Sequence, residues 1–310
     1  MLKNILRKKF LISLTAIFIL LVIYITSNEP VKFKQELSYA DNNVSVSSVY
    51  LLDSYELLSL APVGLLEDKI ENKAKEIVDI LIQDGPGENK IPSGFKSIIN
   101  QDVVLNDIKF NNGILSLNFS KNLFDTKEEY EIKIIESLIY SLTSIDGVKG
   151  IEISLDGKKL EELPKSKLKL PKTLDKSFGI NKKYNLSSLD NVNKVTIYYV
   201  NKYNDNYYYV PVTRYLNNSE EKVSIIVEEL KDNNYNLTGL MSFMNSNANL
   251  IDMSIEKNEI TLNFDKNLYN DQNNKEVFKE VINTINLSIE ATYGISSVSY
   301  IVDAEPLNFN

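Results

Sequence analysis

Apolar residues recur every three or four positions in four stretches of the chain, and this spacing predicts four amphipathic helices. The stripes are Ile70, Ala74, Ile77, Val78 and Leu81; Ile132, Ile135, Leu138, Ile139 and Leu142; Val223, Ile226, Val227 and Leu230; and Val277, Val281, Ile285 and Ile289. Two of the helices are preceded by residues with capping-box spacing, Thr126 with Glu129 and, more loosely, Asn273 with Glu276. These pairs predict where the two helices begin. Gly147 and Gly294 are expected to end helices in a left-handed conformation.

Strict alternation of apolar residues predicts strands between these helices. The turn Asn112-Gly113 precedes the first alternating set, and Lys257-Asn258 precedes the second, with Asn258 suited to positive φ. The inward positions are Leu115, Leu117 and Phe119, then Leu262 and Phe264. A later strand is expected in each half, at Ile151, Ile153 and Leu155, and at Val298, Tyr300 and Val302.

The two halves of the pattern are one sequence repeated. LNFSKNLFD (117–125) and LNFDKNLYN (262–270) match at six of nine positions with a shift of 145 residues. The same shift carries GFKSIIN (94–100) onto GLMSFMN (239–245), and slightly different shifts align the flanking segments. Small changes of offset are what loop insertions produce, so the chain holds two copies of one domain.

This order of elements predicts an α+β fold with two tandem small domains, each a mixed sheet with two helices packed on one face, after an N-terminal transmembrane helix. The expected boundaries are 1–27 for the basic flank and membrane helix, 28–44 for a linker, 45–160 for the first domain, 161–190 for a basic linker rich in Pro and Lys, and 191–310 for the second domain.

Composition removes several classes of function. The 310 residues include no Cys and no His, which excludes thiolate chemistry, Ser-His-Asp catalysis and the usual zinc ligands. Four basic residues precede Phe10; the remaining 30 basic residues face 42 acidic ones, a balance of −12 that argues against nucleic-acid binding. No cofactor is expected.

The N-terminus carries a run from Phe10 to Ile25 without a charge. The length of this run, sixteen residues, lies between that of a signal-peptide core and that of a spanning helix. TSNEP, which follows it, is a poor cleavage site. We expect an uncleaved anchor with its basic flank inside, which places the acidic body outside the cytoplasm in a single-pass membrane protein. The anchor residues are Phe10, Leu14, Ile17, Leu21 and Ile25.

Candidates for chemistry are weak. A cell-wall hydrolase could use one of three carboxylate pairs: Asp102 with Asp107, Glu152 with Asp156, or Glu228 with Glu229. Carboxylates are also ordinary on exposed strands, turns and helices. The oxygen-rich segments 201–206 and 270–276 lack calcium-loop spacing. The sequence therefore predicts no catalytic residue and no metal site.

Tyrosines crowd one predicted hairpin of the second copy. They are Tyr198, Tyr199, Tyr203, Tyr207, Tyr208, Tyr209 and Tyr215. Aromatic residues suit strands, so about half are expected to be core packing. The others could contact a protein partner or stack on glycan strands.

The segment between the copies has a Lys excess, with Lys165, Lys167, Lys169 and Lys172. The simpler interpretation is a solvated linker. The alternative is a basic strap that meets an acidic surface or an anionic envelope polymer.

The ordered set of motifs resembles the GerM domain of sporulation and spore germination proteins. It comprises LIQDGPG (81–87), IPSG (91–94), ILSLNF (114–119), SLTSIDGVKGIEISLDGKKL (141–160) and VTIYYV…YYYVPVTRYL (195–216). The first copy lacks the arginine that Arg214 supplies in the second copy. The second has Asp303-Ala304 where the first has Asp156-Gly157. These departures argue against a ligand site common to both copies.

The resemblance implies a membrane-tethered, non-enzymatic envelope protein whose domain is similar to ring-building modules of the sporulation secretion channel. We therefore expect a scaffold or interaction protein acting in sporulation or germination, with envelope proteins of a channel or spore coat as partners and a homo-oligomer as a possibility. Tyr207, Tyr209 and Arg214 are its candidate interaction surface. A peptidoglycan-binding protein is the alternative, and a carboxylate-dependent hydrolase is a more distant one.

Overall fold

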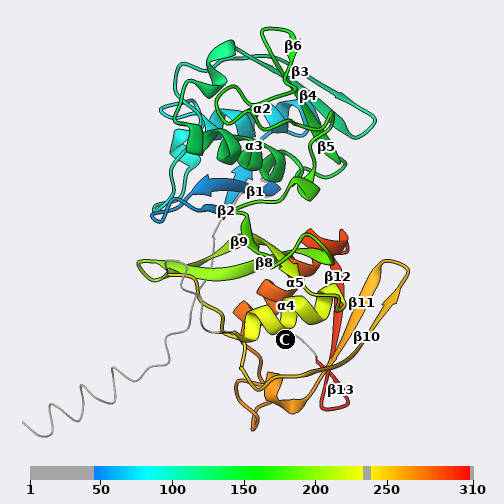
Figure 1. Cartoon of the computed structure of the whole chain (residues 1–310). Helices are drawn as coiled ribbons and strands as arrows, with labels where there is room; N and C mark the ends of the chain where they lie inside the picture. Colours follow the sequence, from blue (N-terminus) through cyan, green and yellow to red (C-terminus); the bar gives the residue numbers. More distant parts are fainter. Residues whose placement is uncertain (1–44, 233–238, 308–310) are drawn as a thin grey trace, which may run out of the picture. The chain divides into compact units, whose positions relative to one another are not determined.

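The computed structural model describes residues 45–232 and 239–307, and the predicted anchor lies outside these residues. Each copy contains a hairpin, a helix, a second hairpin, a longer helix and a final strand pair (Figure 1). The α+β class and the tandem arrangement are confirmed. In the described part of the chain, no helix is long and apolar enough to cross a membrane.

The first copy begins with the hairpin β1–β2 and continues through α2 and α3 to a four-stranded mixed sheet in the order β3-β4-β5-β6. Within that sheet β4 and β5 are parallel and the other neighbours are antiparallel. The bounds are β1 (Ser45–Leu52), β2 (Leu58–Leu65), α2 (Ile70–Leu81), η1 (Glu88–Lys90), β3 (Leu105–Asn111), β4 (Ile114–Phe119), η2 (Lys121–Phe124), α3 (Glu128–Leu142), β5 (Gly150–Leu155) and β6 (Lys158–Lys159).

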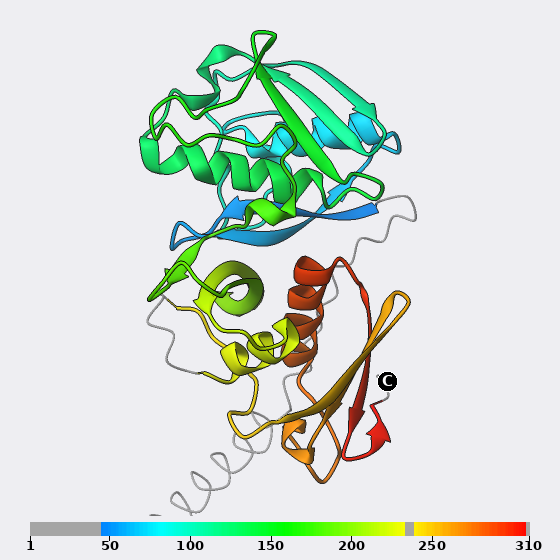
Figure 2. The same ribbon diagram turned by 45° about the vertical axis from the view of Figure 1, so that its right-hand side comes forward.

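The second copy repeats this order, with a sheet β10-β11-β12-β13. Its bounds are β8 (Val192–Tyr203), β9 (Asn206–Asn217), α4 (Lys222–Lys231), β10 (Leu250–Glu256), β11 (Glu259–Phe264), η4 (Lys266–Leu268), α5 (Lys279–Tyr293), β12 (Ser297–Val302) and β13 (Glu305–Pro306). In each copy the helices lie between the first hairpin and the four-stranded sheet, as both views show (Figures 1 and 2).

The predicted inward faces are confirmed. Leu115, Leu117 and Phe119 in β4, and Leu262 and Phe264 in β11, are at most 1% exposed. The apolar stripes of the four helices supply most of the remaining core, because alternate strand positions and every third or fourth helix position meet in the same layer.

Helix starts differ from the capping-box prediction. Helix α3 begins after Lys127 and α5 after Phe278, and neither cap residue makes a side-chain cap bond. In the second copy Asp271 instead accepts the backbone N–H groups of Asn273 and Asn274, which makes a separate turn there. The predicted helical start near Asn273, with Val277 in the stripe, was therefore wrong by about one and a half turns.

The positive-φ predictions are confirmed for most positions. Asn112 and Gly113 have φ of 50° and 85°, and Gly294 ends α5 at 70°. Lys257, rather than Asn258, takes the left-handed position in its turn, with φ of 55°. Gly147 has φ of 86° but follows the end of α3 by several residues, because Thr143 is the cap.

The first hairpins of the two copies do not form separate sheets. Strand β9 pairs along its length with β8, and its other edge pairs with β2 of the first copy and with β7 (Lys183–Asn185) of the connecting segment. Both copies therefore share one five-stranded sheet. The sequence pattern gives no indication of this sheet, because strand pairing between copies leaves no periodic signal.

The outer strands of the shared sheet are closed by the long helices. Ser141 Oγ on α3 accepts the N–H of Tyr50 in β1 at 2.8 Å, and Ser288 Oγ on α5 accepts the N–H of Tyr198 in β8 at 2.8 Å. These hydroxyls bind backbone groups that an edge strand would otherwise present to other chains. The matching contacts also fix which residues of α3 and α5 are equivalent.

Candidate functional site

The predicted surface residues Tyr207, Tyr209 and Arg214 all lie on β9, but the structure does not bring them together. Successive side chains of a strand point to opposite faces, so Tyr207 and Tyr209 share one face and Arg214 lies on the other. Whether these residues bind a partner stays a prediction, and each of the three has different neighbours.

Tyr207 belongs to a cluster of three aromatic rings, which we call the aromatic patch: Tyr207, Phe243 and Phe278. The Tyr207 and Phe243 ring centroids are 5.2 Å apart with planes at 78°, and those of Phe243 and Phe278 are 6.2 Å apart with planes at 89°. Phe278 precedes the first turn of α5 and is 51% exposed. Lys202 Nζ lies 5.6 Å from the centroid of the Tyr207 ring.

Sequence reasoning missed Phe243 and Phe278. Phe243 stands where the first copy has Ile98, and Phe278 falls in a stretch that the apolar spacing assigned to a helix interior. A helix that begins at Lys279 leaves Phe278 as the half-exposed residue before it. Only the correct helix start would have revealed its exposure.

Tyr209 is less accessible than the prediction assumed. The backbone of Tyr209 pairs with that of Leu60 in β2. The Tyr209 hydroxyl accepts a hydrogen bond from Asn283 Nδ2 on α5 at 2.7 Å. Burial raises the pKa of the phenol, and the bond from Asn283 opposes that shift. Tyr209 therefore contributes to the join between the copies.

Arg214 is bound on the opposite face of β9. Its Nη1 lies 3.0 Å from Glu229 Oε2 on α4, with the two side chains 15% and 17% exposed. Because this ion pair links the hairpin to the helix of the same copy, it gives Arg214 a structural role whether or not a partner also contacts it.

The remaining tyrosines divide as expected between core and surface. Tyr198, Tyr199 and Tyr208 are buried, while Tyr215 stacks on Tyr184 of β7 with centroids 4.7 Å apart. The Tyr198 hydroxyl lies 2.7 Å from that of Tyr50, its equivalent in the first copy, and burial raises the pKa of both phenols.

The join between the copies is approximately two-fold. Tyr203 at the second hairpin packs against Gly94 of the first copy, where an added Cβ would lie 2.5 Å from its ring. Reciprocally, Tyr55 at the first hairpin packs against Gly239, where an added Cβ would lie 3.0 Å from its ring. Each copy thus supplies its hairpin tip to the other. Tyr208 also donates to the buried carboxylate of Asp53 at 3.0 Å.

Asn181 completes the sheet where β2 and β9 separate. Pro211 has no N–H, so it cannot donate to the Leu58 carbonyl across the ladder. The Asn181 amide takes its place: Nδ2 donates to Leu58 O and to Pro211 O, each at 2.8 Å, and Oδ1 accepts the Leu58 N–H at 3.1 Å. Its φ of 46° is one that asparagine tolerates better than most residues.

The segment 161–190 is a solvated linker only in part: Lys165, Lys167, Lys169 and Lys172 are exposed, but other residues are buried. Leu163, Leu174 and Ile180 are at most 3% exposed, because the segment folds back on α3. Besides β7 it contains η3 (Lys176–Phe178). Lys182 Nζ lies 2.8 Å from Glu136 Oε1 and 3.6 Å from the centroid of the Phe178 ring. Burial raises the pKa of Glu136, and Lys182 opposes that shift.

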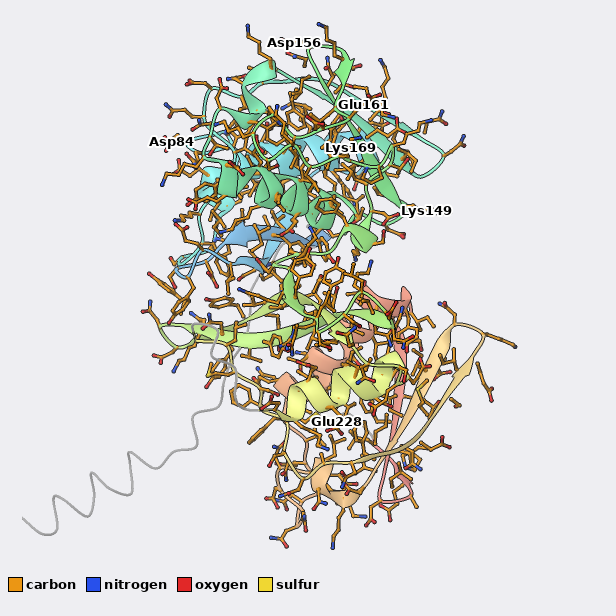
Figure 3. All side chains as sticks on the ribbon, in the orientation of Figure 1. Asp84, Lys149, Asp156, Glu161, Lys169 and Glu228 are labelled. Atoms are coloured by element: carbon orange, nitrogen blue, oxygen red, sulfur yellow. The ribbon has the colours of Figure 1, made fainter. Side chains whose placement is uncertain are left out.

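The carboxylate pairs weighed for catalysis lie in different elements, and several of the carboxylates have local partners. Asp107 pairs with Lys109 at 2.6 Å and Glu228 with Lys231 at 2.8 Å, while Glu229 is bound by Arg214. Figure 3 labels Asp156 at the turn between β5 and β6, and Glu228 on α4 of the other copy. Among residues 45–232 and 239–307, no group of three or more acidic side chains is placed to hold a metal ion.

The chain matches the family model Germane, described as sporulation and spore germination, over residues 48–161 and again over 196–308. It is 28% identical to the spore germination protein GerM of Bacillus subtilis (strain 168) over 282 residues, 88% of this chain and 76% of that protein. The solved structure of the tandem GerMN domains of the sporulation protein GerM from Bacillus subtilis superimposes with a TM-score of 0.77 at 25% identity, covering 84% of this chain and 92% of that one. The chain therefore belongs to the Germane family of sporulation and spore germination proteins, with two copies of the family's domain.

Proposed function

We propose that this protein is a non-enzymatic scaffold of the cell envelope that holds another protein during sporulation or spore germination. Membership of the family gives it a role in one of these processes. The observation that carries the scaffold proposal is the aromatic patch: three rings from β9, a loop and the start of α5 gather at one surface, with Phe278 half exposed. Tyr207 and Phe243 are partly buried beside it. Aromatic residues are enriched at protein contact sites.

Membrane attachment is part of the proposal and rests on the sequence. The uncharged run from Phe10 to Ile25 follows Lys3, Arg7, Lys8 and Lys9, an arrangement that orients the acidic body away from the cytoplasm. A tether would raise the local concentration of the two domains at the membrane, so that modest contacts with a partner suffice.

The proposal also holds that the protein does not cleave the cell wall. Asp107, Glu228 and Glu229 are bound by lysine or arginine partners, Glu152 is bound by the Thr173 hydroxyl, and Asp102 and Asp156 lie in exposed turns. A wall hydrolase needs two carboxyls at one cleft with unequal proton affinities. Incubating residues 28–310 with purified peptidoglycan should release no soluble fragments, and release of fragments would contradict the proposal.

The proposed role is tested in the organism that makes the protein. Deleting the gene should lower the yield of spores or the fraction that germinates, and the full-length chain should restore it. A chain without residues 1–27 should fail to restore it and should no longer sediment with membranes. Recovery of the full-length protein in the cytosolic fraction, or normal sporulation and germination without the gene, would contradict the scaffold proposal.

A further inference from the structure

Phe278 of the aromatic patch lies at a position whose counterpart in the first copy is covered by the chain itself. The Ser141 and Ser288 hydroxyls bind equivalent backbone N–H groups of β1 and β8, so α3 and α5 align with a shift of 147 residues. In this alignment Glu131 is the counterpart of Phe278, and Glu136 is the counterpart of Asn283.

In the first copy the α3 positions Glu131 and Glu136 are covered by the connecting segment, through its residues 165, 166 and 181. Glu131 is 0% exposed, and its carboxylate accepts the backbone N–H groups of Lys165 at 2.8 Å and Ser166 at 2.9 Å. Leu163, two residues earlier, inserts into the core and is 0% exposed. Further along, Glu136 accepts the Asn181 N–H at 2.9 Å. A stretch of polypeptide therefore lies against the start and middle of α3.

In the second copy the same surface has different chemistry. A phenyl ring at Phe278 replaces the carboxylate of Glu131, and Asn283 bonds Tyr209 instead of a covering segment. Phe243 and Tyr207 extend the apolar surface away from Phe278. The exposed half of Phe278 is thus available at a position where the first copy buries its counterpart completely.

We propose that the aromatic patch binds an extended segment of another polypeptide, which places a bulky apolar side chain against Phe243 and Phe278 as Leu163 is placed in the first copy. This inference rests on the proposed scaffold function and names the chemistry of the partner. The loss of the Glu131 carboxylate means that side-chain burial, rather than acceptance of backbone N–H groups, supplies most of the affinity.

The ring geometry favours this occupant over a glycan. Sugars stack on open ring faces, whereas each edge-to-face contact in the patch sets the edge of one ring against the face of its neighbour, at interplanar angles of 78° and 89°. Perpendicular rings form a corner that receives a branched or aromatic side chain. Glycan strands are therefore an outcome that the test must exclude.

Photo-crosslinking in the producing cells tests the inference on the full chain. A benzophenone amino acid replaces Phe278, and in a matched control it replaces Tyr184, which is 65% exposed on β7. The crosslinked residues are identified by mass spectrometry. We expect position 278 to crosslink to an apolar stretch of a different protein, and Tyr207→Ser on the same chain to reduce that crosslink about tenfold, as expected for a residue central to an interface.

The outcomes separate this inference from the proposed function. Position 278 could crosslink to glycan, to a second copy of the chain, or to nothing, while position 184 crosslinks to another protein. Any of these results would overturn the patch as the docking site and leave the scaffold function standing. Protein crosslinks from neither position, with normal sporulation of the deletion strain, would overturn both. An unchanged urea-unfolding midpoint for Tyr207→Ser would show that the loss of crosslinking is not a loss of fold.

Discussion

Asn181 shows how one side chain can set the relation between two domains. Its amide satisfies a donor and two acceptors of Leu58 and Pro211, and its backbone takes a left-handed φ of 46°. Buried polar groups that lose their partners are costly, typically about 1–3 kcal/mol each. The position therefore combines a hydrogen-bonding requirement with a conformational one.

Asn181→Ala should lower the free energy of unfolding by about 3 kcal/mol, because backbone groups of two strands lose partners in the interior. The measurement is urea unfolding followed by circular dichroism. Asn191→Ala is the matched control: Asn191 has φ of 53° at an exposed position, so it should cost only about 1 kcal/mol for the conformation. Equal losses for both variants would show that the hydrogen bonds of Asn181 contribute little.

Asp265 gives a prediction about pH. Burial raises the pKa of this carboxyl, but hydrogen bonds from Asn249 and Asn267 outweigh burial and lower it below its ordinary value of 3.8. A lowered folded-state pKa contributes stability above the unfolded value, and this stability is lost as the pH falls through the folded value. The ionised group thus stabilises the start of η4 at neutral pH.

Asp265→Asn should therefore be less stable than the natural chain at pH 7, and the gap should shrink as the pH falls below 3.8. Urea unfolding of both proteins at several pH values measures the gap. A gap of constant size down to about pH 2.5 would contradict the assigned role of the charge.

At the scale of elements, the sequence predicted those features that depend only on residues close together in the chain. The stripe of α2 and the alternation of β4 repeat with a period that depends only on local geometry, so both were visible. The start of α5 depends on Asp271 and Asn270 binding nearby N–H groups, a competition among local hydrogen bonds that spacing does not resolve. The pairing of β2 with β9 depends on residues 149 positions apart and has no local signature.

The equivalent turns after β5 and β12 differ by glycine in one and alanine in the other, so each residue can be substituted by the other. Asp156-Gly157 has φ of 46° and 78°, and Asp303-Ala304 has φ of 53° and 63°. Ala304→Gly should raise the free energy of unfolding by about 1 kcal/mol, because glycine removes the left-handed penalty. Gly157→Ala should lower it by a similar amount; an added Cβ there meets nothing within 4 Å, so no clash contributes. Chemical denaturation measures both changes, and opposite signs are required.

At the scale of the whole molecule, the shared sheet predicts one cooperative unit. Hairpin tips reach into opposite copies, and the hydroxyls of Tyr50 and Tyr198 meet between them. Opening either copy would therefore disrupt strand pairing in the other. Residues 45–310 should unfold in a single transition, and the amide protons of Tyr50 and Tyr198 should exchange with equal opening free energies. Two separate transitions in urea would contradict this coupling.

The reciprocal exchange of hairpin tips has a consequence for how the two copies can diverge. Consider instead two identical separate chains related by the same approximate two-fold axis as the two copies. They would associate only above some concentration, and every substitution would appear in both chains. Joining them through residues 161–190 makes association independent of concentration and lets each half change alone. Glu131 and Phe278 occupy equivalent positions, yet one binds the chain's own backbone and the other remains half exposed. The covalent connection thus turns a symmetric pair into an asymmetric molecule, in which one half can be dedicated to holding the pair together and the other to outside contacts.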